Sequence, residues 1–179
     1  MSNQPETQLS PRHQAMLATF QQHVYAEITG DLTTTMATMN ANPYVYHIPT
    51  MTGGEGYDGV RHFYANHLVG KFLPPDAEVI TLSRTFGENQ LVEEGVARFT
   101  HTMMMDSLLP GVEPTGKRVE IALVVIVGFD SEGKIACERI YWDQASVLVQ
   151  LGLLDPTGLP VTGAANVQKL VALAHHPTG

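Results

Sequence analysis

Hydrophobic positions are densest from Val119 to Phe129, where apolar and β-branched residues run almost without interruption. Val, Ile and Phe suit a pleated, packed surface. The polar turn at residues 130–133 ends in Gly133, which can supply the positive φ of a short hairpin turn. Both faces of this strand are apolar at its centre, a pattern that is typical of a strand inside a sheet covered on both sides.

A second strand, from Lys134 to Trp142, returns from this turn and ends at Asp143. Because side chains alternate along a strand, Arg139, Tyr141 and Asp143 share one of its faces. A guanidinium, a phenol and a carboxylate aligned on one face of a buried strand indicate the wall of a pocket. We therefore expect this face to line a binding site.

Helical periodicity dominates the first part of the chain, and strands follow it. Apolar residues recur at helical spacing in residues 11–29, 32–39 and 60–68. The pattern predicts strands over residues 44–48, 78–86 and 90–105, and short helices over residues 145–151 and near residue 170. Helices first and then consecutive antiparallel strands are typical of an α+β fold rather than an α/β fold.

A glycine-rich stretch at residues 53–59 contains a literal G-x-G-x-x-G, formed by Gly54, Gly56 and Gly59. It follows a predicted strand and precedes a helix, as the motif does in dinucleotide-binding folds. Those folds need repeated strand–helix–strand units, however, and here the later strands follow one another without helices. We interpret the stretch as a mobile loop at the mouth of a pocket rather than as a nucleotide site.

Length and composition are those of a globular protein. The chain has 179 residues, 44% hydrophobic and 16% charged, and we expect a single domain over residues 1–179. Its formal net charge of −8 argues against nucleic acid and anionic lipid as partners. The sequence lacks both a membrane-spanning apolar run and the apolar segment of a signal peptide. With a single cysteine, Cys137, and therefore no intramolecular disulfide, we expect a cytoplasmic protein.

Four short motifs carry a resemblance to a known family. They are Pro114-Thr115-Gly116-Lys117, Gly133-Lys134-Ile135, Trp142-Asp143 and Gln150-Leu151-Gly152. In this order and spacing they resemble the SnoaL-like polyketide cyclase family of the nuclear-transport-factor-two-like superfamily. The resemblance covers roughly residues 15–152 and leaves a C-terminal helical tail, residues 153–179, unaccounted for. It implies a cone-shaped, curved antiparallel sheet around a pocket that three N-terminal helices close, and it also implies a homodimer.

The resemblance assigns roles to individual residues as well. The acid/base aspartate of the family matches Asp143, and a polar position that is often histidine matches His101. The sequence departs from the family at Arg139, where many members have an aromatic residue. It departs again at residues 102–105, which replace a small, glycine-containing stretch. We therefore expect a pocket shaped for something other than the family's best-known polyketides.

Asp143 is the strongest candidate for a catalytic group. A base that removes a proton next to a carbonyl needs a pKa near the working pH, which partial burial in an apolar cavity can provide. Two other roles are open to this residue. Aspartate is a preferred N-cap and could begin the helix near Ala145, and Arg139 lies four residues back on the same face, where it could form an ion pair.

His101 is the second catalytic candidate, because an imidazole can move protons or polarise a carbonyl, although a hydrogen-bonded histidine of the sheet is equally consistent with the pattern. The candidates for substrate binding combine polar donors with adaptable apolar surface, and they are His47, Arg139, Tyr141, Tyr46, Phe63 and Met103. Arg139 could instead pair with Glu93 or Glu94. The histidines form neither an H-E-x-x-H motif nor a set of two histidines and one carboxylate, so we predict no metal site.

These observations predict an enzyme without a cofactor that acts on a small apolar or carbonyl-containing ligand. Lyase, isomerase or cyclase chemistry needs one poised base, an apolar pocket and donors for the developing oxyanion, and Asp143 would be that base. Two alternatives remain open. One is a non-catalytic protein of the same fold that binds a small molecule, and the other is an epoxide-hydrolase-like hydrolase that uses Asp143, Arg139 and another carboxylate.

Overall fold

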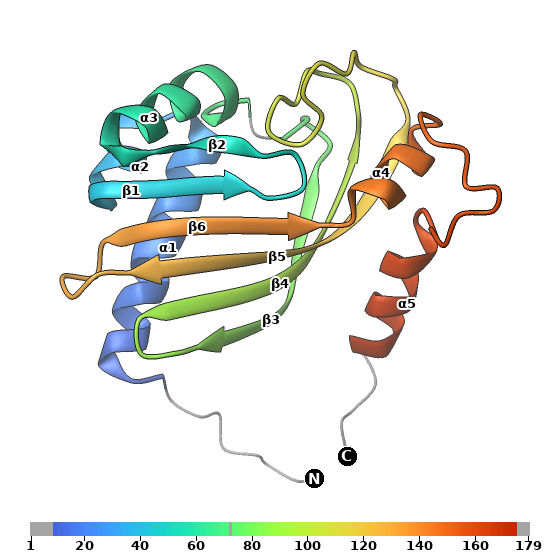
Figure 1. Cartoon of the computed structure of the whole chain (residues 1–179). Coiled ribbons are helices and arrows are strands. Elements are labelled where there is room, and N and C mark those ends of the chain that lie inside the picture. The colour runs from blue at the N-terminus through green and yellow to red at the C-terminus, as the bar shows by residue number, and fades with distance from the viewer. Residues whose placement is uncertain (1–8, 72, 175–179) are drawn as a thin grey trace, which may run out of the picture.

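The computed structural model describes residues 9–71 and 73–174. Helices and strands follow one another in the order shown in Figure 1. The helices are α1 (Pro11–Thr29), α2 (Leu32–Ala37), α3 (Gly56–Phe63), the π-helix η1 (Tyr64–Leu68), α4 (Gln144–Gln150) and α5 (Ala165–Ala174). The strands are β1 (Met39–His47), β2 (Thr52–Glu55), β3 (Glu78–Phe86), β4 (Gln90–Thr100), β5 (Arg118–Phe129) and β6 (Ile135–Trp142). Within the described ranges, no helix is both long enough and apolar enough to cross a membrane.

The six strands form one curved sheet in the order β2-β1-β6-β5-β4-β3. Neighbouring strands run antiparallel, with the exception of β1 and β6, which run parallel. The α+β architecture is as predicted, but the sheet is mixed rather than wholly antiparallel. A tight turn forces antiparallel pairing only between strands that are close in sequence, and most of the chain separates β1 from β6.

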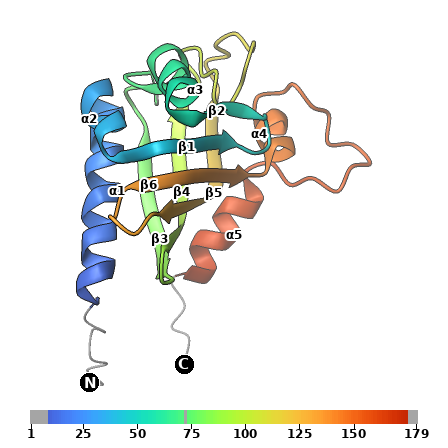
Figure 2. The ribbon, with the colours of Figure 1, turned by 60° about the vertical axis from the view of Figure 1, so that its left-hand side comes forward.

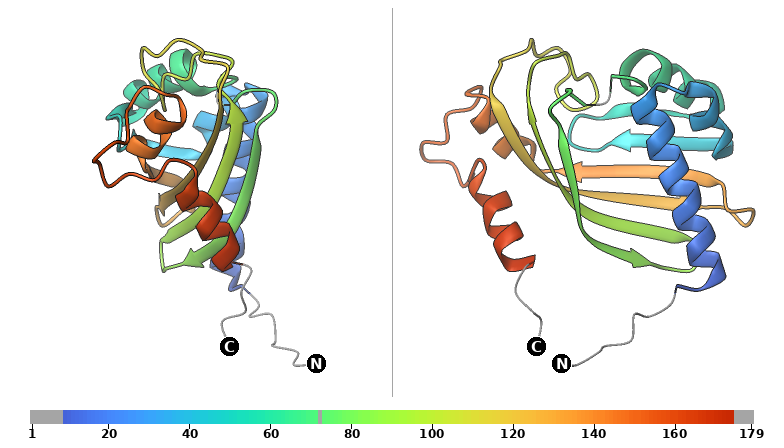
Figure 3. Two further views of the ribbon diagram at one scale, coloured as in Figure 1. Left: turned by 90° about the vertical axis from the view of Figure 1, so that its right-hand side faces the viewer. Right: turned by 180° about the vertical axis from the view of Figure 1, so that it is seen from behind.

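Two helices cover opposite faces of this sheet. α1 crosses one face, as the view from behind shows (Figure 3), and α5 lies on the other side (Figure 2). α1 starts after Ser10, whose hydroxyl accepts a hydrogen bond from the backbone N–H of His13, and it ends at Gly30 with a φ of 81°. These are the start and end that the sequence predicts.

Two hydrophobic clusters hold the layers together. The larger one lies between α1, α3, η1 and the sheet, and its fully buried members include Met16, Val45, Val60 and Tyr64. The smaller one lies where the segment 101–117 folds over the other end of the sheet, and its members include Phe99, Met105, Leu109 and Val147. Burial of one such side chain contributes about 1.5–3 kcal/mol, so these clusters fix α1 and α4 relative to the strands.

The glycine-rich stretch at residues 53–59 is regular structure, and the prediction of a mobile loop is wrong. Residues up to Glu55 form β2, which pairs with β1, and α3 begins at Gly56. A Cβ atom at Gly53 would lie 1.9 Å from the carbonyl oxygen of Val45, and one at Gly54 would lie 2.4 Å from that of Gly59. The glycines are therefore required because the backbones of β1, β2 and α3 approach one another too closely for a side chain.

The helix predicted over residues 60–68 changes its winding at Tyr64. It is α-helical up to Phe63 and continues as the π-helix η1 to Leu68. Single π-helical turns of this kind are rare and occur frequently at functional sites. Here the turn carries Tyr64, whose side chain is fully buried and points to a cluster of charged residues beneath α1.

Candidate active site

A cavity of about 180 Å³ lies between α1 and the sheet. Its lining is almost entirely apolar, and the strands contribute residues such as Val45, Ala97, Phe99, Ile121 and Val125. Ile28 and Val79 also line it, although they are 56% and 55% exposed, so the cavity opens to solvent between the end of α1 and the start of β3. The polar groups of the lining are few, and they are Glu27, His47, Glu93, Ser107 and Glu138.

The face of β6 that lines this cavity is the opposite of the predicted one. Glu138, Ile140 and Trp142 face the cavity, whereas Tyr141 and Asp143 line a shallow groove on the outer face of the sheet. The prediction chose the face with more polar residues. The outer face is partly open to solvent, where polar side chains are well tolerated, and the cavity side carries a single charged residue among apolar ones.

Asp143 caps α4. Its carboxylate accepts hydrogen bonds from the backbone N–H of Ser146 at 3.1 Å and from the Ser146 hydroxyl at 2.5 Å. The side-chain amide of Asn166 in α5 also donates to it at 3.4 Å. Arg139 does not pair with Asp143 but donates to the side chain of Gln90 at 3.3 Å. Of the roles open to Asp143, the geometry therefore favours the N-cap, and its catalytic role stays a prediction.

The other predicted site residues are dispersed. Nδ1 of His101 accepts a hydrogen bond from the backbone N–H of Thr115 at 3.3 Å, so this buried ring holds the segment that enters β5. Burial lowers the pKa of His101. Tyr46 donates to Glu55 at 3.0 Å, Phe63 packs in the larger cluster, and Met103 packs against the smaller one. Of all the predicted residues, only His47 is part of the cavity lining in the described part of the chain.

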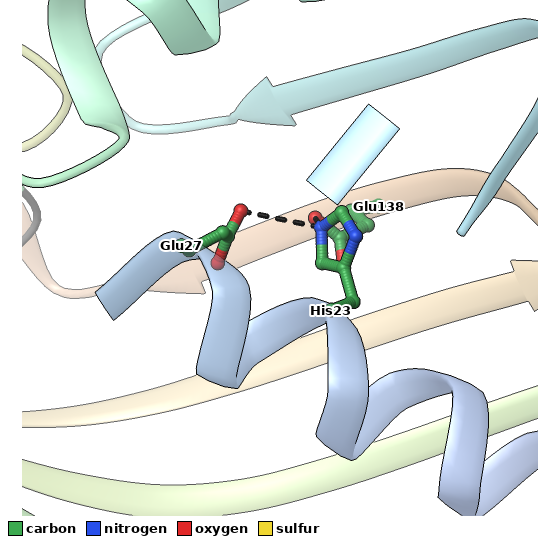
Figure 4. Close-up of side chains that lie close together, drawn as sticks. All are labelled: His23, Glu27 and Glu138. Carbon is green, nitrogen blue, oxygen red and sulfur yellow. Dashed lines mark ion pairs between the residues drawn. The ribbon is translucent and has the colours of Figure 1, made fainter. Parts of the chain in front are cut away.

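A buried charged cluster forms one side of the cavity (Figure 4). His23 and Glu27 lie one turn apart on α1, and Glu138 comes from β6. Nε2 of His23 lies 3.2 Å from Glu27 Oε1 and 3.5 Å from Glu138 Oε2. Tyr64 of η1 donates a hydrogen bond to Glu138 Oε2 at 3.0 Å, and its hydroxyl oxygen lies 3.1 Å from His23 Nε2.

The hydrogen bonds around His23 place a proton on Nδ1, and the two nearby carboxyl groups favour a second proton on Nε2. Nδ1 lies 2.7 Å from the hydroxyl oxygen of Thr38, and that hydroxyl donates its own proton to the carbonyl of Thr35 at 2.6 Å. The Thr38 oxygen must therefore accept from Nδ1–H. Nε2 faces two carboxylates and carries the second proton. Although burial alone would lower the pKa of His23, the charges of Glu138 and Glu27 outweigh it and raise that pKa well above its ordinary value.

The two carboxyl groups are not equivalent. The single Nε2–H of His23 cannot serve both, and Glu138 has in addition the hydroxyl of Tyr64. Burial would raise the pKa of Glu138, but the charge of His23 and the hydrogen bonds from His23 and Tyr64 outweigh burial and lower it. Burial raises the pKa of Glu27, because His23 offsets it only in part, and Glu27 Oε1 has no hydrogen bond of good geometry within the described residues.

Backbone contacts fix Glu27 in this position. Its carbonyl oxygen accepts hydrogen bonds from the N–H groups of Gly30 and Gly70, at 3.4 and 2.9 Å. Gly70 follows η1, so the end of α1 is joined directly to the end of the π-helix. Both glycines have positive φ, 81° and 72°, and a Cβ at Gly70 would lie 3.5 Å from the Cα of Gly30. A Cβ would fit at both positions, so glycine is favoured there by the positive φ, which allows the two turns that hold Glu27 over the cavity.

His47 is a second polar group inside the cavity. Its side chain is 5% exposed, and its ring lies between those of Phe63 and Trp142, with centroids 5.7 and 6.0 Å away. Burial lowers the pKa of His47 to about 4, against an opposing effect of the Glu138 charge, so the ring is neutral near pH 7. Its Nδ1 has no hydrogen-bond partner within the described residues.

The charged cluster was missed by the sequence prediction, although a signal for it exists. His23 and Glu27 lie on the same side of α1 as the apolar residues Phe20 and Val24. Glu138 lies on the same face of β6 as Ile140 and Trp142. A charged residue inside an apolar stripe is expensive to bury unless it is paired. A charged residue in an apolar stripe is therefore a better indicator of a functional site than a polar residue on a polar face.

The cluster also has the donor set of a cation site. Ligand-type atoms of His23, Glu27 and Glu138 all lie within 4.8 Å of one another, and one histidine with two carboxylates can hold a divalent metal ion. The prediction of no metal site rested on the spacing of histidines and carboxylates along the sequence. Spacing of this kind does not reveal a group of ligands in which two residues come from α1 and the third from β6. In the arrangement described above, the proton on Nε2 of His23 occupies the place that a metal would need.

Comparison with known proteins agrees with this architecture. The family model of the SnoaL-like polyketide cyclase matches residues 16–151. The chain belongs to the SnoaL-like polyketide cyclase family. The match ends at the end of α4, so α5 lies outside it. Among curated proteins, no sequence matches this member of the family.

Solved structures show the same fold at low sequence identity. A protein from Jannaschia sp. CCS1, named as a SnoaL-like polyketide cyclase, is 18% identical with a TM-score of 0.63, covering 83% of this chain and 99% of its own. A Δ5-3-ketosteroid isomerase from Mycobacterium sp. is 20% identical with a TM-score of 0.51, and the match covers 72% of this chain and 93% of the isomerase. SalBIII is an epoxide hydrolase/cyclase-like enzyme with a role in pyran ring formation in the polyether salinomycin. It is 17% identical with a TM-score of 0.54, and the match covers 73% of this chain and 92% of SalBIII. At this identity the likeness concerns the fold alone.

Proposed function

We propose that this protein is an enzyme without a cofactor that moves a proton next to the carbonyl group of a small, mostly apolar substrate. The observation that carries the proposal is Glu27, a buried carboxyl group that lines an apolar cavity and keeps one oxygen without a good hydrogen bond. Burial raises the pKa of Glu27, and a raised carboxyl pKa makes a stronger base at neutral pH. Glu27 takes the role that the sequence assigned to Asp143.

The neighbours of Glu27 support this role. His23 and Glu138 form an ion pair beside it, so the cluster already contains one balanced pair before a substrate enters. Tyr64 and Thr38 hold that pair through hydrogen bonds. The proton of the substrate then passes to Glu27 and returns to carbon from it. The apolar lining excludes water and strengthens each electrostatic contact within the cavity.

Lyase, isomerase and cyclase reactions share this proton transfer. The family to which the chain belongs is named for cyclases, and a structure of the same fold is a ketosteroid isomerase. One name refers to a polyketide and the other to a ketosteroid, and both are carbonyl compounds. The proposal therefore places the protein in this class of acid–base enzymes and identifies Glu27 as its acid/base.

Exchange of α-protons for deuterium tests the proposal directly. A bicyclic ketone such as decalone is incubated with the protein in D₂O, and loss of the α-proton signals is followed by NMR. We expect the wild-type protein to accelerate exchange and Glu27→Gln to reduce the acceleration by about 100-fold or more. Glu94→Gln, which changes a carboxylate on the outer face of the sheet, is the control.

Three results would contradict the proposal. Decalone that binds in calorimetry without exchanging makes the protein a non-catalytic binder. Full exchange by Glu27→Gln removes the proposed base. Exchange that disappears with EDTA and returns with Zn²⁺ or Mg²⁺ shows that His23, Glu27 and Glu138 act as metal ligands instead.

A second reaction, the opening of an epoxide, is favoured by one specific observation. Glu27 and Glu138 face the same cavity, and their pKa values are shifted in opposite directions, upward and downward. An acid that protonates the epoxide oxygen next to a base that activates a nucleophile is the arrangement this reaction needs. Formation of the diol from styrene oxide tests this reaction. The epoxide function would be selected over the first if the wild-type protein forms the diol, both Glu27→Gln and Glu138→Gln lose this activity, and decalone does not exchange its α-protons.

A further inference from the structure

An apolar row on α1 leads from the interior of the cavity to its mouth. Phe20, Val24 and Ile28 follow one another at four-residue spacing, which places them on one side of the helix, and all three line the cavity. Phe20 is 6% exposed, Val24 is half-buried and Ile28 is 56% exposed. The row therefore begins in the core and ends in solvent.

The sheet provides a matching row on the other side of the mouth. Val79 of β3 is paired with Ala97 of β4, and residues directly opposite each other in an antiparallel pair project from the same face. Both line the cavity, but Ala97 is 4% exposed and Val79 is 55% exposed. The mouth thus has an apolar side chain on each side, Ile28 from the helix and Val79 from the sheet.

The cavity is smaller than a pocket that encloses a whole ligand. Its volume is about 180 Å³, whereas pockets that bury most of a drug-sized ligand measure about 300–1,000 Å³. A ligand of that size has to extend through the mouth. Single exposed apolar residues are common on protein surfaces, but Ile28 and Val79 continue the lining of one cavity and offer packing surface to the part of the ligand that extends outside.

The charge on the neighbouring strands is already balanced. Glu93 is the charged residue that β4 contributes to the lining, and Nε of Arg84 in β3 donates to its Oε2 at 2.7 Å. The hydroxyl of Thr81 donates to its Oε1 at 3.2 Å. Because these side chains satisfy one another, β3 and β4 offer a ligand apolar contact rather than an unpaired charge.

We propose that the substrate is an apolar ketone longer than the cavity, and that its hydrocarbon chain passes through the mouth and packs between Ile28 and Val79. The inference rests on the function proposed above and names the substrate class of the same site. The ketone end lies inside the cavity, and the far end of the chain reaches water.

Ketones that differ only in chain length test the proposal by binding alone. The series consists of cyclohexanones with an ethyl, propyl, butyl, pentyl or heptyl chain opposite the carbonyl carbon, and calorimetry measures their Kd. We expect Kd to fall by about fourfold for each methylene that packs in the mouth. The double variant Ile28→Gln, Val79→Thr should weaken binding of the heptyl ketone by about tenfold and of the ethyl ketone by about twofold at most.

Ile80→Thr is the matched control for Val79→Thr. Ile80 is the next residue of β3, is 39% exposed and projects from the opposite face of the strand, so this substitution should leave every Kd unchanged. Circular dichroism confirms that each variant is folded. Equal Kd values along the series would overturn the proposal, as would a double variant that binds the heptyl ketone as tightly as the wild-type protein.

The far end of the chain reports where the chain lies. A hydroxyl group on the last carbon of the heptyl chain meets water if the chain leaves through the mouth, so it should change Kd by about threefold at most. A chain folded inside the cavity would bury that hydroxyl among apolar groups and weaken binding by about tenfold or more, which would contradict the proposal. A dimer that dissociates in Ile28→Gln, with no effect on the ketones, would assign the two residues to contact with a second copy instead.

The outcomes separate this inference from the proposed function. If decalone exchanges its α-protons but Kd does not depend on the chain, the substrate class is wrong and the function stands. If Kd depends on the chain and on Ile28 and Val79 but no ketone exchanges in D₂O, the chain site stands and the proposed function fails. If both hold, kcat/KM for exchange should rise along the series in the same fourfold steps, because the added contact is made in the transition state as well.

Discussion

His23 and His47 are held in opposite charge states by their surroundings. His23 has two carboxylates beside it, which raise its pKa well above the ordinary value despite burial. His47 has no partner for Nδ1, and burial lowers its pKa to about 4. Groups whose pKa values are pushed apart within one site are a frequent sign of divided acid–base roles. Here the cation, His23, belongs to the ion pair with Glu138, and the neutral ring of His47 lines the cavity.

The lowered pKa of His47 predicts a loss of stability in mild acid. In the unfolded chain its pKa is about 6.5, so between about pH 6.5 and 4 the unfolded state binds a proton that the folded state does not. The free energy of unfolding should therefore fall by about 3 kcal/mol as the pH decreases through this range on account of His47 alone. Urea unfolding of the wild-type protein and His47→Phe at several pH values measures the difference.

The comparison isolates His47 because other titrating groups are common to both proteins. His47→Phe should lose stability less steeply between pH 6.5 and 4, and the two curves should converge in slope above pH 7. Ile140→Val, a change of packing at the paired position of β6, should keep the wild-type slope. Parallel curves for the wild-type protein and His47→Phe would show that the buried ring is protonated as readily in the folded state as in the unfolded one.

Single residues were predictable only where the local pattern determines their role. α1 has the predicted bounds, and α2 begins at the predicted residue, because the caps Ser10, Gly30 and Asp31 act on their neighbours along the chain. His47 was predicted as a substrate contact and does line the cavity. Glu27 and Glu138 were not predicted, since their meeting depends on how α1 crosses the sheet, and no local pattern contains that information.

Among elements, the strands were predicted better than the faces they present. β3 has the predicted bounds, and β5 and β6 differ from prediction by one residue at one end. Their pairing follows from hairpin turns, which are local. On β6 the prediction selected Arg139, Tyr141 and Asp143 by their polarity, whereas the cavity beneath α1 is lined by the opposite face. The three residues lie on the partly open side, which α5 covers only in part.

The role of Asp143 can be decided by two substitutions. Asn is as good an N-cap as Asp, whereas Ala cannot accept the hydrogen bonds from Ser146. We therefore expect Asp143→Ala to lower the free energy of unfolding by about 1 kcal/mol and Asp143→Asn to lower it much less. Deuterium exchange of decalone should persist in Asp143→Asn.

A different result would restore the assignment made from the sequence. If Asp143→Asn abolishes exchange while decalone still binds and the protein keeps its stability, the carboxylate itself is needed in the reaction. In that case α4 must move away from the sheet during turnover, because the carboxylate now lies outside the cavity and is hydrogen-bonded to Ser146 and Asn166.

At the scale of the molecule, α5 limits where a second subunit can pack. Leu170 of α5 lies in the outer groove with Ala122 and Val124 of β5, and the family match ends before this helix. The remaining outer face, over β1 and β6, presents Tyr44 and Tyr141, which are 36% and 38% exposed. Aromatic residues are enriched at protein interfaces, and a stable interface buries about 800 Å² on each partner.

We expect the protein to form a homodimer through the outer face of β1 and β6. Sedimentation velocity over a range of concentrations should show a dimer that dissociates on dilution, and Tyr141→Lys should weaken it by at least about tenfold, because a buried lysine without a partner is costly. Tyr57→Lys, on the exposed side of α3, is the control and should leave the dimer unchanged. A monomer at every concentration would contradict the prediction. A dimer that is insensitive to Tyr141→Lys would place the interface elsewhere on the protein.

Since Tyr141 and Glu138 project from opposite faces of β6, dissociation by Tyr141→Lys should leave deuterium exchange in the cavity intact.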